Sequence, residues 1–114
     1  MKYALLLYSS PETRERHLEG GDAILAEYAA ISQAPGVVDG LRLQEPESAT
    51  TVRVENGDAL LSDGPFVAAK EYLGGLFVIE ADNLDAATAV AQKVPTARLG
   101  GAVEVRPINE QPLT

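Results

Sequence analysis

Cysteine is absent from this chain of 114 residues, which contains one histidine and no tryptophan. The absence of cysteine excludes disulfides, thiol catalysis and every zinc or iron–sulfur site that depends on cysteine. It is typical of proteins that work in a reducing cytoplasm. The acidic residues show no metal-ligand spacing around the single histidine, so we expect neither a metal nor another cofactor.

Basic runs and long apolar runs are also missing. Lys and Arg number 9 against 17 Asp and Glu, which gives a formal net charge of −8. Such a protein is repelled by phosphate backbones and anionic lipids, so we expect no direct nucleic-acid partner and no membrane. No stretch approaches the roughly 18 apolar residues of a membrane span, and we see no signal peptide. We therefore expect a soluble, cytoplasmic, single-domain protein over residues 1–114.

Most of the recognisable local patterns in the sequence are typical of β-strands. Residues 2–8 and 75–81 are apolar on both alternating faces, which predicts two central strands covered on both sides. Weaker alternation predicts strands at 37–43, 50–55, 58–62 and 102–107, with Gly40 at a bulge or close approach. Asn56-Gly57 between two of these is the strongest short signal for a two-residue hairpin turn.

Helix signals fall between the strands. Ser10 and Pro11 are typical of a helix start, and Gly20-Gly21 predicts a break soon after it. A second helical run from Asp22 to Ala34 places on one face Ile24, Leu25, Tyr28, Ile31 and Ser32. Asn83 caps a third helix that Pro95 is expected to stop, with an apolar stripe of Ala87, Val90, Ala91 and Val94.

The predicted order is β-α-β, a hairpin, then β-α-β. Right-handed crossovers put both helices on one face of one sheet, which predicts a ferredoxin-like α+β sandwich with an inserted hairpin. The central strands are apolar on their other face as well, so that face needs a cover. We expect a second copy to provide it, sheet against sheet, in a homodimer.

One stretch combines turn residues with chemistry-bearing side chains. Asp63-Gly64-Pro65-Phe66, Lys70-Glu71 and Leu73-Gly74-Gly75 together resemble the signature of the DGPF (DGPFAETKE) proteins of the YCII-related superfamily. The similarity extends to Met1–Tyr3, Thr50–Arg53, Pro95 and Val103–Pro107, although Ala68 and Ala69 replace the family's acidic residue and threonine.

The resemblance implies a dimeric α/β barrel made of ferredoxin-like monomers packed through their sheets. The family's members are mostly uncharacterised. Some resemble proteins encoded beside, or fused to, extracytoplasmic-function sigma factors, which implies a regulatory link.

The signature loop has two interpretations. In the functional one, Asp63 is a base or hydrogen-bond acceptor at a pocket mouth, Phe66 is an apolar wall, and Gly64 and Pro65 fix the backbone between them. In the structural one, Asp63 caps a turn, Gly64 supplies an unusual φ angle and Phe66 fills the core.

Each of the remaining charged candidates also has a functional and a structural interpretation. Lys70 could hold an anionic ligand, with Glu71 beside it, or both could be solvated or paired with a second copy. Glu104 and Arg106 share one strand face, where Arg106 could bind a carboxylate or form an interfacial ion pair with Glu104. His17 could perform acid–base work or lie on a solvated face among charged neighbours.

These observations leave three functions open. The first is a regulatory homodimer that binds a small, anionic molecule near the signature loop. The second is an enzyme that uses acid–base chemistry in the same pocket, with Asp63, Lys70, Arg106 and His17 as its actors. The third is an interaction module without a pocket. The first two predict that Asp63, Lys70 and Arg106 approach one cavity.

Overall fold

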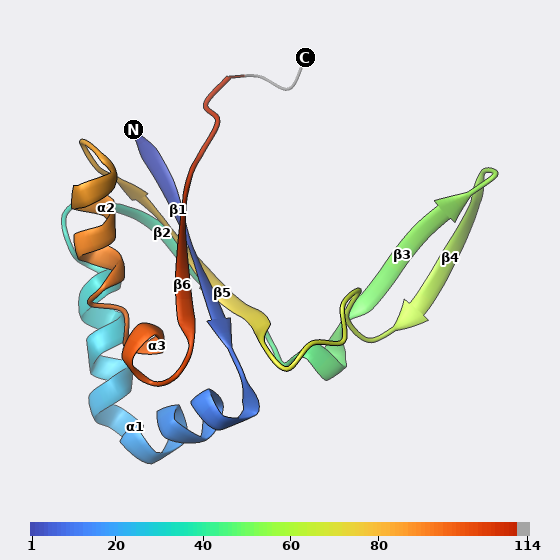
Figure 1. The fold of residues 1–114 in the computed structure, drawn as a ribbon, viewed down its shortest axis with the longest axis horizontal. Coiled ribbons are helices and arrows are strands. Elements are labelled where there is room, and N and C mark those ends of the chain that lie inside the picture. Colours follow the sequence, from blue (N-terminus) through green and yellow to red (C-terminus); the bar gives the residue numbers. More distant parts are fainter. Residues whose placement is uncertain (112–114) are drawn as a thin grey trace.

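The computed structural model describes residues 1–111 as a sheet with helices on one face and a separate hairpin (Figure 1). The four-stranded sheet consists of β1 (Lys2–Ser9), β2 (Val37–Arg42), β5 (Tyr72–Glu80) and β6 (Ala102–Pro107). The helices are α1 (Pro11–Ser32), α2 (Leu84–Ala91) and α3 (Pro95–Arg98). A 3₁₀ turn, η1 (Pro46–Ser48), precedes a hairpin made of β3 (Thr50–Glu55) and β4 (Asp58–Asp63).

The sheet order is β2-β5-β1-β6, and each neighbouring pair is antiparallel. This arrangement, with β1 and β5 central, is consistent with the predicted ferredoxin-like α+β fold. Gly40 follows a register shift in β2, and a Cβ added there would lie 2.7 Å from the Phe77 ring. The predicted close approach at Gly40 is therefore confirmed.

Local signals explain where the helices begin and bend. The Ser10 side chain accepts a hydrogen bond from the Thr13 amide at 3.2 Å, and the Asn83 side chain accepts one from Ala86 at 2.9 Å. The predicted break lies at Gly21, whose φ of 55° and ψ of −136° kink α1. Pro95 does not stop the third helix, because α2 has already ended at Ala91 and Pro95 opens α3.

The core lies between the sheet and the helices. It contains Tyr3, Leu5, Leu7, Phe77 and Ile79 from the sheet, and Ile31, Ala87, Ala91 and Val94 from the helical side. Leu25 was expected in this layer but is 58% exposed. Ile24, Tyr28 and Ile31 form the inner face at i, i+4 and i+7, and Leu25 falls about 100° around the helix from Ile24.

The opposite sheet face is only half buried in the protomer. Ala4 and Leu6 of β1 and Leu76 and Val78 of β5 form an apolar strip there, which we call the open face. Val103 and Val105 pack toward the core, so Glu104 and Arg106 lie on the open face, as predicted. No helix in residues 1–111 is long and apolar enough to cross a membrane.

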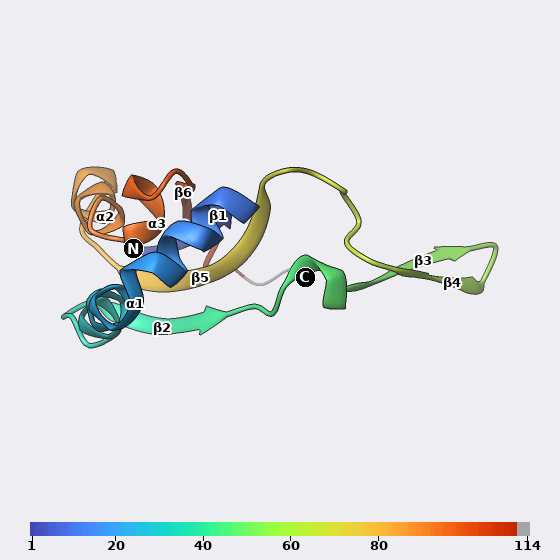
Figure 2. The ribbon, with the colours of Figure 1, turned by 90° about the horizontal axis from the view of Figure 1, so that it is seen from below.

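The β3–β4 hairpin, which we call the arm, stands apart from this body. Figures 1 and 2 show it projecting away from the sheet and from all three α-helices. Its turn residues Asn56 and Gly57 have φ angles of 51° and 82°, as the predicted two-residue turn requires. The radius of gyration is 16.0 Å, whereas a compact chain of this length has about 13 Å.

Candidate functional site

Two loops meet at the end of the sheet from which the arm departs. One loop, residues 43–49, joins β2 to β3, and the other, residues 64–71, joins β4 to β5. The Leu43 amide donates to the Gly74 carbonyl at 2.9 Å, and the Gly64 amide donates to the Ala49 carbonyl at 2.7 Å. These bonds hold both loops beside the start of β5, where they border two adjoining cavities.

The larger of these, cavity B, has a volume of about 570 Å³, within the usual range of roughly 300–1,000 Å³ for small-molecule sites. Its wall is mainly apolar and includes Tyr8, Leu43, Pro65, Val67, Tyr72 and Leu73. Its charged lining consists of Glu45 and Glu71. Cavity B therefore combines an apolar wall with two carboxylates and no basic side chain.

Glu45 connects the loop to both the sheet and α1. Its Oε1 lies 3.3 Å from the Arg14 guanidinium, and its Oε2 accepts a hydrogen bond from the Tyr72 hydroxyl at 3.3 Å. Burial raises the pKa of Tyr72, and the nearby Glu45 charge raises it further. Tyr72 therefore stays a neutral hydrogen-bond donor at the cavity wall at neutral pH.

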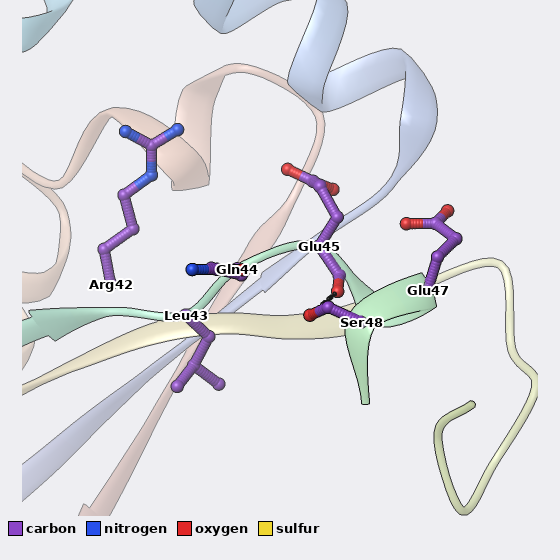
Figure 3. Close-up of a pocket in the computed structure, with 6 residues that line it drawn as sticks. All are labelled: Arg42, Leu43, Gln44, Glu45, Glu47 and Ser48. Atoms are coloured by element: carbon purple, nitrogen blue, oxygen red, sulfur yellow. Dashed lines mark hydrogen bonds between the residues drawn. The ribbon is translucent and has the colours of Figure 1, made fainter. Parts of the chain in front are cut away.

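Cavity A, of about 540 Å³, lies along the same 43–49 loop. Figure 3 shows Arg42, Glu45 and Glu47 pointing to one side of the chain and Leu43 to the other. The Ser48 hydroxyl donates to the Glu45 carbonyl at 2.7 Å and fixes the turn between the two carboxylates. Arg42 gives cavity A a cation that cavity B lacks.

A polar chain links the two halves of the kinked α1 to α3. His17 Nε2 lies 2.6 Å from the Tyr28 hydroxyl, which lies 2.6 Å from Thr96 Oγ1. His17 Nδ1 lies 2.8 Å from the Thr13 carbonyl, which can only accept. In the neutral ring Nδ1 therefore carries the proton, Tyr28 donates to Nε2, and Thr96 donates to Tyr28.

The environment of Tyr28 keeps its hydroxyl protonated. Burial raises the pKa of Tyr28, while the Thr96 hydrogen bond and the charges of Arg42 and Arg98 lower it in part. The interpretation of His17 as a solvated residue is wrong, because its ring is half buried, bonded at both nitrogens and stacked on Tyr28.

The signature loop agrees with the structural interpretation at Gly64 but not at Phe66. Pro65 and Glu71 line cavity B, and Gly64 has the φ of 97° that glycine tolerates. Phe66 does not fill the core, because it is 68% exposed and lies 4.7 Å beneath the Arg53 guanidinium. The Thr51 hydroxyl donates to the Gly64 carbonyl at 2.8 Å, so this loop also anchors the arm.

The three residues expected to converge have separate positions in the protomer. Asp63 ends β4 at the root of the arm, Lys70 is exposed in the next loop, and Arg106 lies on the open face. Within residues 1–111, no hydrogen bond or ion pair joins any two of them. Arg106 Nε instead donates to Glu104 Oε1 at 2.9 Å. Their shared cavity stays a prediction.

Glu45 joins the 43–49 loop to Arg14 and Tyr72, and neither of these contacts was predicted as part of a site. The segment around Glu45 lies between two predicted strands, at 37–43 and 50–55, and no functional role is predicted for it from the sequence. The available signal was Glu45-Pro46-Glu47, an acidic pair around a proline that fixes the backbone. The contacts themselves join positions 31 and 27 residues apart, which no local pattern encodes.

Comparisons with known proteins add a family and a fold. Residues 1–111 match the model of the YCII-related domain. An uncharacterised protein of Rhizobium meliloti (strain 1021), R00369, is 32% identical over 95% of this chain and 92% of its own length. A solved structure, 5-chloro-2-hydroxyhydroquinone dehydrochlorinase from Burkholderia phenoliruptrix AC1100 in complex with 2,5-dihydroxybenzoquinone, has a TM-score of 0.54. The two chains are 15% identical over 97% of this one and 96% of the other, which is evidence of a shared fold.

Proposed function

This chain belongs to the YCII-related domain family, and on that premise we propose that it binds a small molecule in cavity B. The observation that carries the proposal is the composition of that cavity. The apolar wall can contact one side of a small ligand, while the Tyr72 hydroxyl and the Glu45 carboxylate provide two oriented polar groups. Pro65 and Glu71 place the signature loop at the same cavity.

The lining favours a neutral ligand that donates hydrogen bonds. Carboxylates accept hydrogen bonds, and cavity B has two of them, of which Glu45 is paired with Arg14. The anionic ligand expected from Lys70 and Arg106 would instead find its cation at Arg42, in cavity A. A phenol suits cavity B, because its ring fits the apolar wall and its hydroxyl can donate to Glu45.

We further propose that two copies pair through the open face, as the sheet pattern predicted. Ala4, Leu6, Leu76 and Val78 form a contiguous apolar strip that only a partner can cover. The dimeric barrel and the DGPF subfamily belong to the same proposal. The regulatory link to sigma factors stays a prediction from the resemblance alone.

Titration of the ¹⁵N-labelled protein with hydroquinone, followed by amide chemical shifts, tests the binding proposal. We expect shifts concentrated in residues 43–49 and 65–73. A charge-assisted hydrogen bond contributes about 1.5–3 kcal/mol, so Glu45→Gln should weaken binding roughly 10- to 100-fold. Glu55→Gln at the arm tip is the control and should leave the affinity unchanged. Shifts confined to other surfaces, or equal affinities for both variants, would refute the proposal.

The second candidate function is acid–base catalysis, and the chain from Thr96 through Tyr28 to His17 favours it. A proton passed from Thr96 Oγ1 through the Tyr28 hydroxyl to Nε2 would charge the ring, and the reverse transfer would return it, while Nδ1 keeps its bond to the Thr13 carbonyl throughout. Asp63 and Lys70 stay predicted actors in this alternative.

Because the structural neighbour is a dehydrochlorinase, 5-chloro-2-hydroxyhydroquinone is the substrate to assay, with chloride release as the measurement. General acid–base catalysis contributes about 10²- to 10⁴-fold, so His17→Gln should remove at least that lower factor. Chloride release no faster than in buffer, or unchanged in His17→Gln, would exclude this role for His17.

A further inference from the structure

The arm has one apolar face and one charged face. The β3–β4 register places Val52 opposite Leu61 and Val54 opposite Ala59, so these four side chains share a face. The other face contains Arg53, Glu55 and Asp58, together with Leu60. This alternation is typical of strands that are covered on one side only. We call the set of Val52, Val54, Ala59 and Leu61 the arm face.

Within residues 1–111, no segment covers the arm face. Val52, Val54 and Leu61 are 59%, 68% and 70% exposed. An isolated two-stranded hairpin is at best marginally stable in water, and it needs a further strand or a packed face. Because the arm projects away from the sheet and the α-helices (Figures 1 and 2), none of these described elements can supply the covering surface, and another molecule can.

A second copy of this chain fits as that molecule. Each copy presents the apolar open face, and the charged residues on it, Lys2, Asp39, Glu80, Glu104 and Arg106, sum to a net charge of −1. Most of the net charge of −8 therefore lies away from this surface, and only a small part of it opposes pairing there.

We propose that the arm is a clasp between protomers, with its apolar face packed on the second copy. The proposal extends the homodimer of the proposed function, which by itself needs only the open faces. In a two-fold dimer both arms make the same contact, so each substitution acts twice. The 64–71 loop at the root of each arm then links the clasp to cavity B, whose wall includes Pro65 and Val67.

Leu61→Lys against Ser62→Lys is the matched test. Both positions are exposed neighbours on β4, both gain one positive charge, and only Leu61 belongs to the arm face. Sedimentation equilibrium should give wild type a molecular mass twice that of the 12.0 kDa chain. We expect Leu61→Lys to raise the dimer dissociation constant at least tenfold, and Ser62→Lys to change it less than twofold. Far-UV circular dichroism checks that both variants keep the fold.

A third variant separates this proposal from the dimer itself. If Leu76→Lys dissociates the dimer and Leu61→Lys does not, the open-face dimer stands and the clasp is refuted. If wild type is monomeric at all concentrations tested, both are refuted. Neither result bears on hydroquinone binding in cavity B, which is measured separately.

The absence of cysteine allows the contact to be observed directly. A spin label on Asp58→Cys, on the charged side of the arm tip, can be mixed with unlabelled, ¹⁵N-enriched wild type. We expect the label to broaden amide signals of the enriched copy, since only an arm from the other protomer carries it. Mixed dimers without such broadening would refute the clasp.

Discussion

Removing the Tyr28 hydroxyl should destabilise the fold measurably, since it is the central link between α1 and α3. Tyr28→Phe keeps the ring that stacks on His17 and deletes the oxygen that lies 2.6 Å from both His17 Nε2 and Thr96 Oγ1. His17 is half buried and can bond to water instead, whereas Thr96 is only 3% exposed. The main cost is therefore the Thr96 hydroxyl left without its partner.

The expected magnitude follows from these two bonds. A hydrogen bond contributes about 1 kcal/mol net, and an unsatisfied buried group costs about 1–3 kcal/mol. We expect Tyr28→Phe to lower the free energy of unfolding by about 2 kcal/mol, a large share of the roughly 5–15 kcal/mol of a typical domain. With an m-value of about 2 kcal/mol/M, the urea midpoint falls by about 1 M.

Urea unfolding followed by circular dichroism measures this change, at one fixed protein concentration because dimers gain stability with concentration. Thr96→Val removes the other hydroxyl, and the double variant completes the cycle. We expect a coupling energy of about 0.5–3 kcal/mol between the two positions. A loss below about 0.5 kcal/mol for Tyr28→Phe, or strictly additive losses, would show that the chain contributes little to stability.

Three further results are expected. Burial raises the pKa of Tyr28, so the stabilisation that its protonated hydroxyl gives to the fold is complete below pH 10 and is lost as the pH rises through the pKa of the folded state. Above pH 10 the free energy of unfolding of Tyr28→Phe should therefore fall less than that of wild type. The Arg98 hydrogen bond lowers the pKa of Glu27, so this pair stabilises the fold above pH 4.5, and the stabilisation is lost as the pH falls through the pKa of the folded state. The free energy of unfolding of Glu27→Gln should therefore lack this decrease at acidic pH. Gly40→Ala should cost about 1–3 kcal/mol in thermal and urea unfolding, because its Cβ would lie 2.7 Å from the buried Phe77 ring, whereas Gly74→Ala, with no atom closer than 3.7 Å, is its control.

The sequence predicted most of the fold, since its signals there are local. Asn56-Gly57 sets its own turn, Ser10 and Asn83 cap the helices that follow them, and Gly21 breaks α1. Apolar residues on both faces of β1 and β5 indicated that these strands are central and that the face away from the helices is apolar. Burial was less predictable at Leu25, because the kink and the position of the sheet, rather than the helical period, decide which side of α1 faces inward.

The site was predicted only where it coincides with the signature loop. Pro65 and Glu71 reach cavity B, but the Glu45 cluster depends on contacts between segments far apart in the sequence. Phe66 is the opposite case, a residue that was expected to be buried or at a pocket and is exposed. An aromatic residue beside glycine and proline suggested a plug or a wall, and its exposure follows from the arm leaving the body at that point.

The 64–71 loop gives the arm and cavity B a common structural element. Gly64 holds the arm root through Ala49 and Thr51, and the next residue, Pro65, lines the cavity. A ligand that orders this loop also restricts the direction of the arm, and an arm held by a second copy restricts the loop. Because coupling between two binding events is reciprocal, a ligand in cavity B that favours the dimer must bind the dimer more tightly by the same factor. If both proposals hold, the 64–71 loop would connect ligand binding in cavity B with the association of two copies of the chain.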